Sequence, residues 1–416
     1  MADYSIAPAG ATISPKTFKA HVAEEKLQLL KDLVKLSPIG TASFENTGAG
    51  RRYGMKREWL ANAKEVWSTS FDWRKHEDRI NSYPNFTVPI TDDGGITIDV
   101  HFIALYSQKK GAIPIAFYHG WPGSVLEFLD MLDLVKRKYT AETLPYHIII
   151  PSLPGYTYSS GPPLDQDYGM VQASMCLDKL MRGLGFAAYL AQGGDIGSRV
   201  SRTQASRSDA CVGFHLNMIS MPPPENHAEL EVSALEKEAL PRVNDFMSTG
   251  SAYAFEHGSR TATIGLALSA SPIAMLSWIG EKFLEWTDED PPLDRILESV
   301  SLYYLTDTFP RCIYPYRGET NGSEGRPRQG QVTSFMPNKT PAKSAFTDKP
   351  LGYSFFPKDI FPVPGSWAAT LGNLVHYSQH DSGGHFAAME KPAELFQDVE
   401  EWASKAWKGQ TSGVKL

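Results

Sequence analysis

The feature that most constrains this chain is a carboxylate, Asp195, set among small residues. It lies in residues 192–198, QGGDIGS, directly after the apolar run of residues 187–191 and before a stretch that can continue as helix. A strand, a sharp turn of small residues and a helix form the context of a nucleophile elbow. Because a carboxylate attacks saturated carbon well but amides poorly, this motif predicts alkylation chemistry, either epoxide opening or halide displacement.

Short apolar runs separated by helical stretches indicate parallel strands that are covered on both faces. Six runs fit this pattern: residues 113–118, 146–151, 187–192, 212–219, 351–356 and 373–377. Between the fourth and fifth runs the chain is mainly helical and ends in a polar loop, residues 318–340. We therefore predict an α/β fold with a mainly parallel sheet, formed by residues 111–221 and 346–416, and a helical lid inserted as residues 222–345.

The first 110 residues follow a different pattern. Residues 18–36 place Leu27, Leu30 and Val34 on one face, which predicts an amphipathic helix, and a second helix is expected around residues 59–67. Residues 96–102 alternate strictly behind a turn and predict a half-buried hairpin strand. Residues 1–110 are thus expected to form an extension of helices and a hairpin packed on the core.

Composition narrows the function classes. The net charge of −7, without a basic stripe, argues against a nucleic-acid partner. No apolar run approaches the roughly 20 residues of a membrane span, and residues 1–15 lack the regions of a signal peptide. The three cysteines, Cys176, Cys211 and Cys312, lack metal-ligand spacing and are expected to be reduced structural thiols. We expect a soluble, cytoplasmic protein without a membrane anchor, and a homodimer stays open.

The last three residues, Val414, Lys415 and Leu416, are similar to a peroxisomal Ser-Lys-Leu address. They lack its small first residue. A cytoplasmic location is therefore favoured over import into peroxisomes.

His385 is the expected base, because it lies in a loop after the last predicted strand, in the chain order nucleophile, acid, base. Asp359 follows the preceding strand and is the expected acid. Asp381 competes with it, but a residue in the same loop as the base seldom reaches the far ring nitrogen. His380, Asp381 and His385 could also suggest a metal cluster, but no further ligand pair at helical spacing accompanies them.

An oxyanion hole is expected from two backbone N–H groups. Residues 119–122, HGWP, follow the strand that ends at residue 118, where a tight turn aims the Trp121 N–H at the elbow. The Ile196 N–H is the second donor. Each such donor contributes roughly 3 to 4 kcal/mol to the step in which negative charge develops.

Three motifs together carry a family resemblance: HGWPGS at residues 119–124, GGDIGS at 193–198 and GGHFAA at 383–388. In this order the chain resembles the microsomal-type epoxide hydrolases of the α/β-hydrolase fold, and is most similar to their soluble fungal members. The resemblance covers nearly the whole chain. It implies hydrolysis of a small-molecule epoxide to a vicinal diol without metal or cofactor, Asp359 as the acid, and a cis bond between Trp121 and Pro122.

The resemblance also implies a proton donor in the lid. A tyrosine stays protonated at neutral pH yet is acidic enough to support the alkoxide of an opening epoxide. The matching positions are Tyr253, in residues 251–254, and Tyr316, in residues 313–317. Tyr314 stays open as a replacement for Tyr316.

Two other functions stay open. A haloalkane or haloacid dehalogenase shares a carboxylate elbow, but the halide-binding Trp or Arg expected after the nucleophile is Ile196 here. A catalytically silent ligand-binding protein usually lacks a triad member, whereas Asp195, Asp359 and His385 are all present. Arg199, one helical turn past the nucleophile, either points outward or pairs with a carboxylate.

Overall fold

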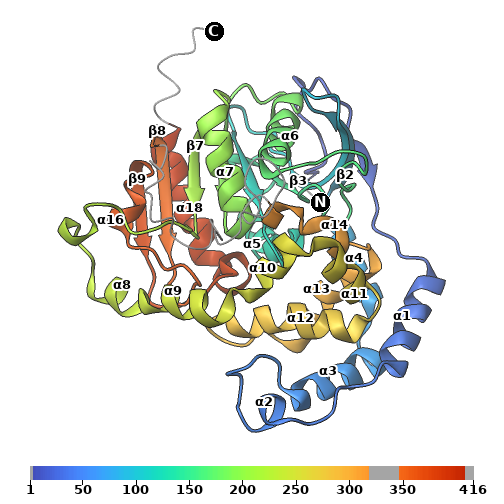
Figure 1. The fold of residues 1–416 in the computed structure, drawn as a ribbon. Coiled ribbons are helices and arrows are strands. Elements are labelled where there is room, and N and C mark those ends of the chain that lie inside the picture. The colour runs from blue at the N-terminus through green and yellow to red at the C-terminus, as the bar shows by residue number, and fades with distance from the viewer. Residues whose placement is uncertain (1–2, 318–345, 408–416) are drawn as a thin grey trace.

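A single nine-stranded sheet organises the molecule (Figure 1). The computed structural model describes residues 3–317 and 346–407. The strand order is β1-β2-β3-β5-β4-β6-β7-β8-β9. The strand bounds are Lys16–Phe18 (β1), Asn85–Thr91 (β2), Thr97–Leu105 (β3), Ile113–Tyr118 (β4), Tyr146–Pro151 (β5), Tyr189–Gly193 (β6), Cys211–Leu216 (β7), Thr347–Phe355 (β8) and Gly372–Gln379 (β9). From β5 to β9 all neighbours pair in parallel, so the prediction of a mainly parallel sheet is confirmed.

The N-terminal hairpin belongs to this sheet. Strands β2 and β3 pair antiparallel, with Thr91 opposite Thr97, and the Asp92 carboxylate accepts the N–H groups of Gly94 and Ile96 across the turn. Strand β3 also pairs antiparallel with β5. The predicted hairpin strand is therefore present, and it is continuous with the core sheet. The boundary at residue 110 stays a prediction.

The predicted helix of residues 18–36 is wrong at its start. Helix α1 spans Glu24–Leu36, while residues Lys16–Phe18 form strand β1 against β2. The apolar residues that gave the helical period, Leu27, Leu30 and Val34, all lie inside α1 and are buried. The strand depends on pairing with a distant segment, which local periodicity does not report. Helices α2 (Phe44–Thr47), α3 (Arg57–Thr69) and α4 (Trp73–Asn81) follow.

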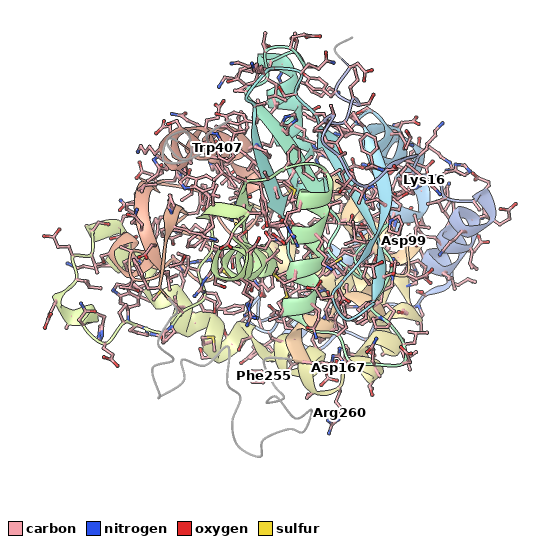
Figure 2. All side chains as sticks on the ribbon, turned by 90° about the horizontal axis from the view of Figure 1, so that it is seen from above. Lys16, Asp99, Asp167, Phe255, Arg260 and Trp407 are labelled. Atoms are coloured by element: carbon pink, nitrogen blue, oxygen red, sulfur yellow. The ribbon has the colours of Figure 1, made fainter. Side chains whose placement is uncertain are left out.

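Helices cover both faces of the sheet. Helix α7 packs on β4, β6 and β7 beside α6, while α18 packs on β8 and β9 beside α5. In Figure 2, Lys16 of β1 and Trp407 after α18 lie on opposite sides of the molecule. The bounds are Leu129–Lys138 (α5), Met170–Gly183 (α6), Asp195–Arg207 (α7), Gly365–Ala368 (α16), Ala387–Glu390 (α17) and Pro392–Ala406 (α18).

The lid lies between β7 and β8 and is helical where it is described. Figure 1 shows its helices in a layer along one end of the sheet, with α1 and α3 beside α12. The bounds are Ala234–Ala239 (α8), Pro241–Asp245 (α9), Ala252–Ser259 (α10), Thr261–Ser269 (α11), Pro272–Glu285 (α12), Leu293–Leu305 (α13) and Phe309–Cys312 (α14). The predicted polar loop of residues 318–340 and the tripeptide of residues 414–416 lie outside the described residues. The lid boundaries of 222 and 345 stay predictions.

The length and composition of the described helices bear on whether one of them could span a membrane. None of them alone is long and apolar enough to cross a membrane. The pair α11 and α12 passes by length and composition together, with a bend of 116° between the two helices.

Candidate active site

Asp195 lies at the turn between β6 and α7, where the sequence predicts an elbow. Its φ of 44° lies in the left-handed region, a conformation that is uncommon for non-glycine residues and that occurs often at active sites. The turn is so tight that a Cβ on Gly193 would lie 2.2 Å from the Gly197 carbonyl oxygen, and a Cβ on Gly197 would lie 2.0 Å from the Tyr118 carbonyl oxygen. Glycine is therefore required at both positions to present the Asp195 side chain.

Two backbone N–H groups face the Asp195 carboxylate. The Trp121 N–H donates to Oδ1 at 2.7 Å, and the Ile196 N–H also bonds the carboxylate. A Cβ on Gly120 would lie 2.1 Å from the same Oδ1, so only glycine leaves room for this approach. Burial acts to raise the pKa of Asp195, but the hydrogen bond and charge of His385 and these two N–H groups outweigh it and lower the pKa. The carboxylate is held ionised. The Trp121–Pro122 bond is cis, as the resemblance implies.

The structure brings His385 and Asp359 to this carboxylate. His385 Nε2 lies 3.4 Å from Asp195 Oδ2, and His385 Nδ1 lies 2.9 Å from Asp359 Oδ1. Burial would lower the pKa of His385, but the charge of Asp359 and the hydrogen bonds to both carboxylates raise it. Asp381, the competing acid, is exposed to solvent, whereas the Asp359 side chain is almost fully buried.

Asp359 is fixed by the backbone around it and by the lid. Its Oδ1 accepts the Ile360 N–H at 2.5 Å, in addition to the bond with His385. Arg242 of α9 donates to the carbonyl oxygens of Asp359, at 3.1 Å, and of Lys358, at 2.8 Å. The lid therefore holds the loop that carries the acid.

The lid places Tyr253 and Tyr316 over the elbow. Both are buried, their ring centroids are 5.8 Å apart, and a hydrogen bond joins their side chains. Tyr253 stacks on the Trp121 indole at 4.9 Å, and Tyr316 meets the same indole edge-on at 6.1 Å. Burial, and then the negative charge of Asp195 among other groups, raise the pKa of both phenols, which keeps them protonated.

Tyr314 lies in a different environment. Its ring packs edge-on against Tyr168 at 5.7 Å, and burial is the main cause that raises its pKa, with Cys176, Cys312 and Arg317 as the neighbouring titratable groups. Of the two candidate tyrosines in residues 313–317, Tyr316 is the one beside Asp195.

His257 belongs to the site although it lies in no sequence motif. His257 lies one helical turn after Tyr253 on α10, and its ring contacts Tyr253, Tyr316 and Trp121. The Trp278 indole N–H donates to His257 Nε2 at 3.0 Å, and burial lowers the pKa of His257 to about 3, so this ring is neutral. The spacing of four residues on one helix is the signal that could have linked His257 to Tyr253.

A small cavity connects these groups. It is lined by Asp195, His385, Trp121, Asn217 and Glu127, among others, and its volume of about 10 Å³ is the space of roughly one water molecule. Burial raises the pKa of Glu127 to about 8; the charge of His385 lowers this pKa and the charge of Asp195 raises it. The described site thus holds room for a water beside both Asp195 and His385.

The loop that carries His385 is attached to residues that follow α12 in the lid. The His385 N–H donates to the Trp286 carbonyl oxygen at 2.8 Å, and the Gly383 N–H donates to the Asp288 carboxylate at 2.9 Å. A Cβ on Gly384 would lie 2.5 Å from the Trp286 carbonyl oxygen. Core loop and lid therefore meet backbone to backbone behind the base.

Two further sequence questions have structural answers. Arg199 is half-buried, and burial lowers the pKa of its guanidinium while the charge of Asp195 raises it, so this side chain lies within the electrostatic field of the site. His380 bonds Asp398 at 2.7 Å. Within residues 3–317 and 346–407, no group of three or more His, Cys, Asp or Glu side chains is arranged to hold a metal ion.

Comparison with known proteins gives consistent results. Residues 15–128 match the family described as "Epoxide hydrolase N terminus", and residues 113–266 match "alpha/beta hydrolase fold". The chain is 51% identical to a Dothistroma septosporum protein that is named as a candidate epoxide hydrolase, over 98% of this chain and 94% of that protein.

Solved structures are similar over the same length. The structure of Aspergillus niger epoxide hydrolase has a TM-score of 0.87 and 46% identity, covering 98% of this chain and all of that one. Juvenile hormone epoxide hydrolase of the silkworm Bombyx mori has a TM-score of 0.77 over 96% of this chain and 95% of its own, and at 23% identity it shows the shared fold. The elbow, the motif order and these matches agree: the chain belongs to the epoxide hydrolase family of the α/β-hydrolase fold.

Proposed function

We propose that this enzyme converts small-molecule epoxides and water to vicinal diols through an ester on Asp195. The observation that carries the proposal is the position of the Asp195 carboxylate, bonded by the Trp121 N–H, beside His385 and beneath two buried tyrosines. Opening an epoxide needs a nucleophile that attacks a ring carbon from one side and a proton donor at the ring oxygen. Both are present at this site.

In the first step the nucleophile is Oδ2 of Asp195, because Oδ1 is bound to the Trp121 N–H. A bond forms between Oδ2 and an epoxide carbon, the C–O bond of the ring breaks, and its electron pair goes to the epoxide oxygen. Tyr253 and Tyr316 give that oxygen a proton. Once Asp195 is an ester its charge is gone, so the pKa of His385 falls and His385 releases the proton that restores the phenol.

In the second step neutral His385, oriented by Asp359, takes a proton from water. The hydroxide adds to the Asp195 ester carbonyl, and the N–H groups of Trp121 and Ile196 stabilise the oxyanion. Collapse breaks the ester bond, and the diol oxygen takes the proton of the new carboxyl group. The cycle ends with Asp195 ionised and His385 protonated, as at its start.

The covalent intermediate provides the test. His385→Gln enzyme mixed with a styrene-type epoxide should accumulate an adduct on the Asp195 peptide in mass spectrometry, because alkylation proceeds while ester hydrolysis does not. Asp195→Asn is the matched control and should give none. An adduct on another residue, or none with an epoxide that the wild type turns over, would refute the assignment.

Measuring halide release distinguishes epoxide hydrolysis from the related dehalogenation of haloalkanes. A haloalkane would form an alkyl ester on Asp195 in place of a hydroxyalkyl ester, but a halide leaves without a proton, so the tyrosine pair favours an epoxide. We expect diol formation from epoxides and no comparable halide release from haloalkanes of similar size. A cytoplasmic location and a homodimer remain predictions, for cell fractionation and light scattering to test.

A further inference from the structure

A buried lysine lies against the aromatic groups of the lid. Lys282 of α12 has a side chain that is 5% exposed, and its Nζ lies 4.8 Å from the ring centroid of Tyr253 and 5.8 Å from that of Trp286. An ammonium group loses several kcal/mol of hydration on burial, so a lysine seldom takes such a position without a strong interaction. The reaction steps derived above make no use of it.

The geometry places the cation and the Trp121 indole on opposite faces of the Tyr253 ring. The indole is stacked on Tyr253, with centroids 4.9 Å apart and an angle of 18° between the planes. That separation leaves no space for an ammonium group between the two rings, so Nζ lies against the other face. A cation within about 6 Å of a ring centroid is attracted by the π system, most strongly where water is excluded.

The counter-charge of Lys282 lies toward solvent. Its Nζ forms an ion pair with Glu281, whose side chain is 26% exposed. Glu285, one turn along the same face of α12, is a weaker partner, because burial raises its pKa to about 7. The carboxylate of Glu281 is therefore hydrated in part, while the ammonium faces the dry aromatic side.

We propose that Lys282 is a positioning residue that acts through Tyr253 and strengthens its phenol as the proton donor to the epoxide oxygen. The proposal rests on the proposed function. As the phenol donates, negative charge develops on its oxygen and spreads into the ring. A cation at the ring face stabilises that charge more than it stabilises the neutral phenol, so the interaction favours the transition state over the ground state.

The surroundings of Tyr253 explain why such support is useful. Burial and the nearby Asp195 carboxylate both raise the pKa of this phenol, while the hydrogen bond with Tyr316 and then the charge of Arg199 lower it. A buried phenol beside a carboxylate is a poor acid. A fixed cation at its ring opposes that effect without contact with substrate.

A double-mutant cycle tests the proposal. Lys282→Met removes the charge and keeps the length of the stem, and Lys282→Arg is the matched control that keeps the charge. In single-turnover experiments with styrene oxide, Lys282→Met should lower the alkylation rate about tenfold and leave the ester hydrolysis rate within about twofold. In a Tyr253→Phe background the same change should alter alkylation by less than about twofold, because the cation then has no phenol to act through.

The outcomes separate an electrostatic role from a packing role. If Lys282→Met slows alkylation equally in the Tyr253→Phe background, slows hydrolysis as much as alkylation, or is matched by Lys282→Arg, the proposal is wrong. If His385→Gln enzyme forms no adduct on Asp195 with an epoxide that the wild type turns over, the proposed function fails instead. Should Lys282→Met not fold, Glu281→Gln replaces it: removal of the compensating carboxylate should speed alkylation, and an unchanged or lower rate overturns the proposal.

Discussion

In the core, Asp195, His385 and Asp359 are joined by hydrogen bonds and opposite charges, with His385 Nδ1 2.9 Å from Asp359 and the Trp121 N–H 2.7 Å from Asp195. In the lid, Tyr253, Tyr316 and His257 are joined mainly by ring packing, at centroid distances of 4.9 to 5.8 Å. In the proposed mechanism Asp195 takes part in both steps, His385 and Asp359 act mainly on ester hydrolysis, and the lid tyrosines act on ring opening. Except at Asp195, a substitution should therefore reveal its region by the step that it slows.

The largest effect is expected from the acid in the core. Asp359→Asn keeps the size of the side chain but loses the charge that orients and supports His385, so ester hydrolysis should slow by about 10⁴-fold. Rapid-quench measurement should show alkylation much less affected and the ester accumulating. Asp381→Asn, in the exposed part of the same loop as the base, is the matched control and should leave hydrolysis near the wild-type rate. The reverse ranking would move the acid to Asp381.

The tyrosine pair should give the next largest effect, and on the other step. Each single change, Tyr253→Phe or Tyr316→Phe, leaves one donor, so alkylation should slow about 10-fold to 100-fold. The double variant should slow alkylation by about 10³-fold or more, because two bonds that strengthen with the alkoxide are lost together. Diol binding should weaken far less. Tyr314→Phe is the control, and a double variant that alkylates Asp195 at near wild-type rate would move the donor elsewhere.

The pH dependence should separate the two regions without any substitution. The pKa of Asp195 is lowered and the pKa values of both tyrosines are raised, so the reactive forms for alkylation persist across the neutral range. In the ester the Asp195 charge is gone, but Asp359 still raises the pKa of His385. Hydrolysis needs neutral His385, so this step should slow about tenfold per pH unit once the pH falls below the pKa that His385 has in the ester. Single-turnover traces at decreasing pH should show the ester building up. Loss of alkylation before hydrolysis would contradict this assignment.

The smallest expected effect is that of Arg242, and it tests whether the core and the lid act on separate steps. Arg242 belongs to the lid but bonds the carbonyl oxygens of Lys358 and Asp359. Arg242→Met should slow hydrolysis about threefold to tenfold, consistent with the loss of two modest hydrogen bonds, and leave alkylation nearly unchanged. Arg260→Met, at the C-terminal end of α10, is a comparison variant, since the Arg260 guanidinium bonds the neighbouring Ser259 carbonyl. Equal effects on both steps would show that Arg242 supports the whole site.

The sequence predicted best what lies within a contiguous motif. The elbow around Asp195 and the turn at Trp121 are each encoded in six or seven neighbouring residues, whose glycines are needed for close contacts that the structure shows. Strand β1 was missed because it exists through its pairing with β2. Lys282 and His257 were missed for a related reason: their importance comes from the rings that packing brings beside them, and a lysine or histidine in a helix has no distinguishing local pattern.

The backbone bond between His385 and Trp286 has a consequence for protein engineering. A common way to broaden substrate range is to loosen a lid so that bulkier molecules can enter. Here the residue after α12, Trp286, also bonds the main chain of His385, the proposed general base, so added freedom in that helix would disturb the alignment of His385 with the ester. We expect libraries that vary α12 near Trp286 to broaden the substrate range at a loss of turnover rate. Libraries confined to α10 should broaden the substrate range without that loss.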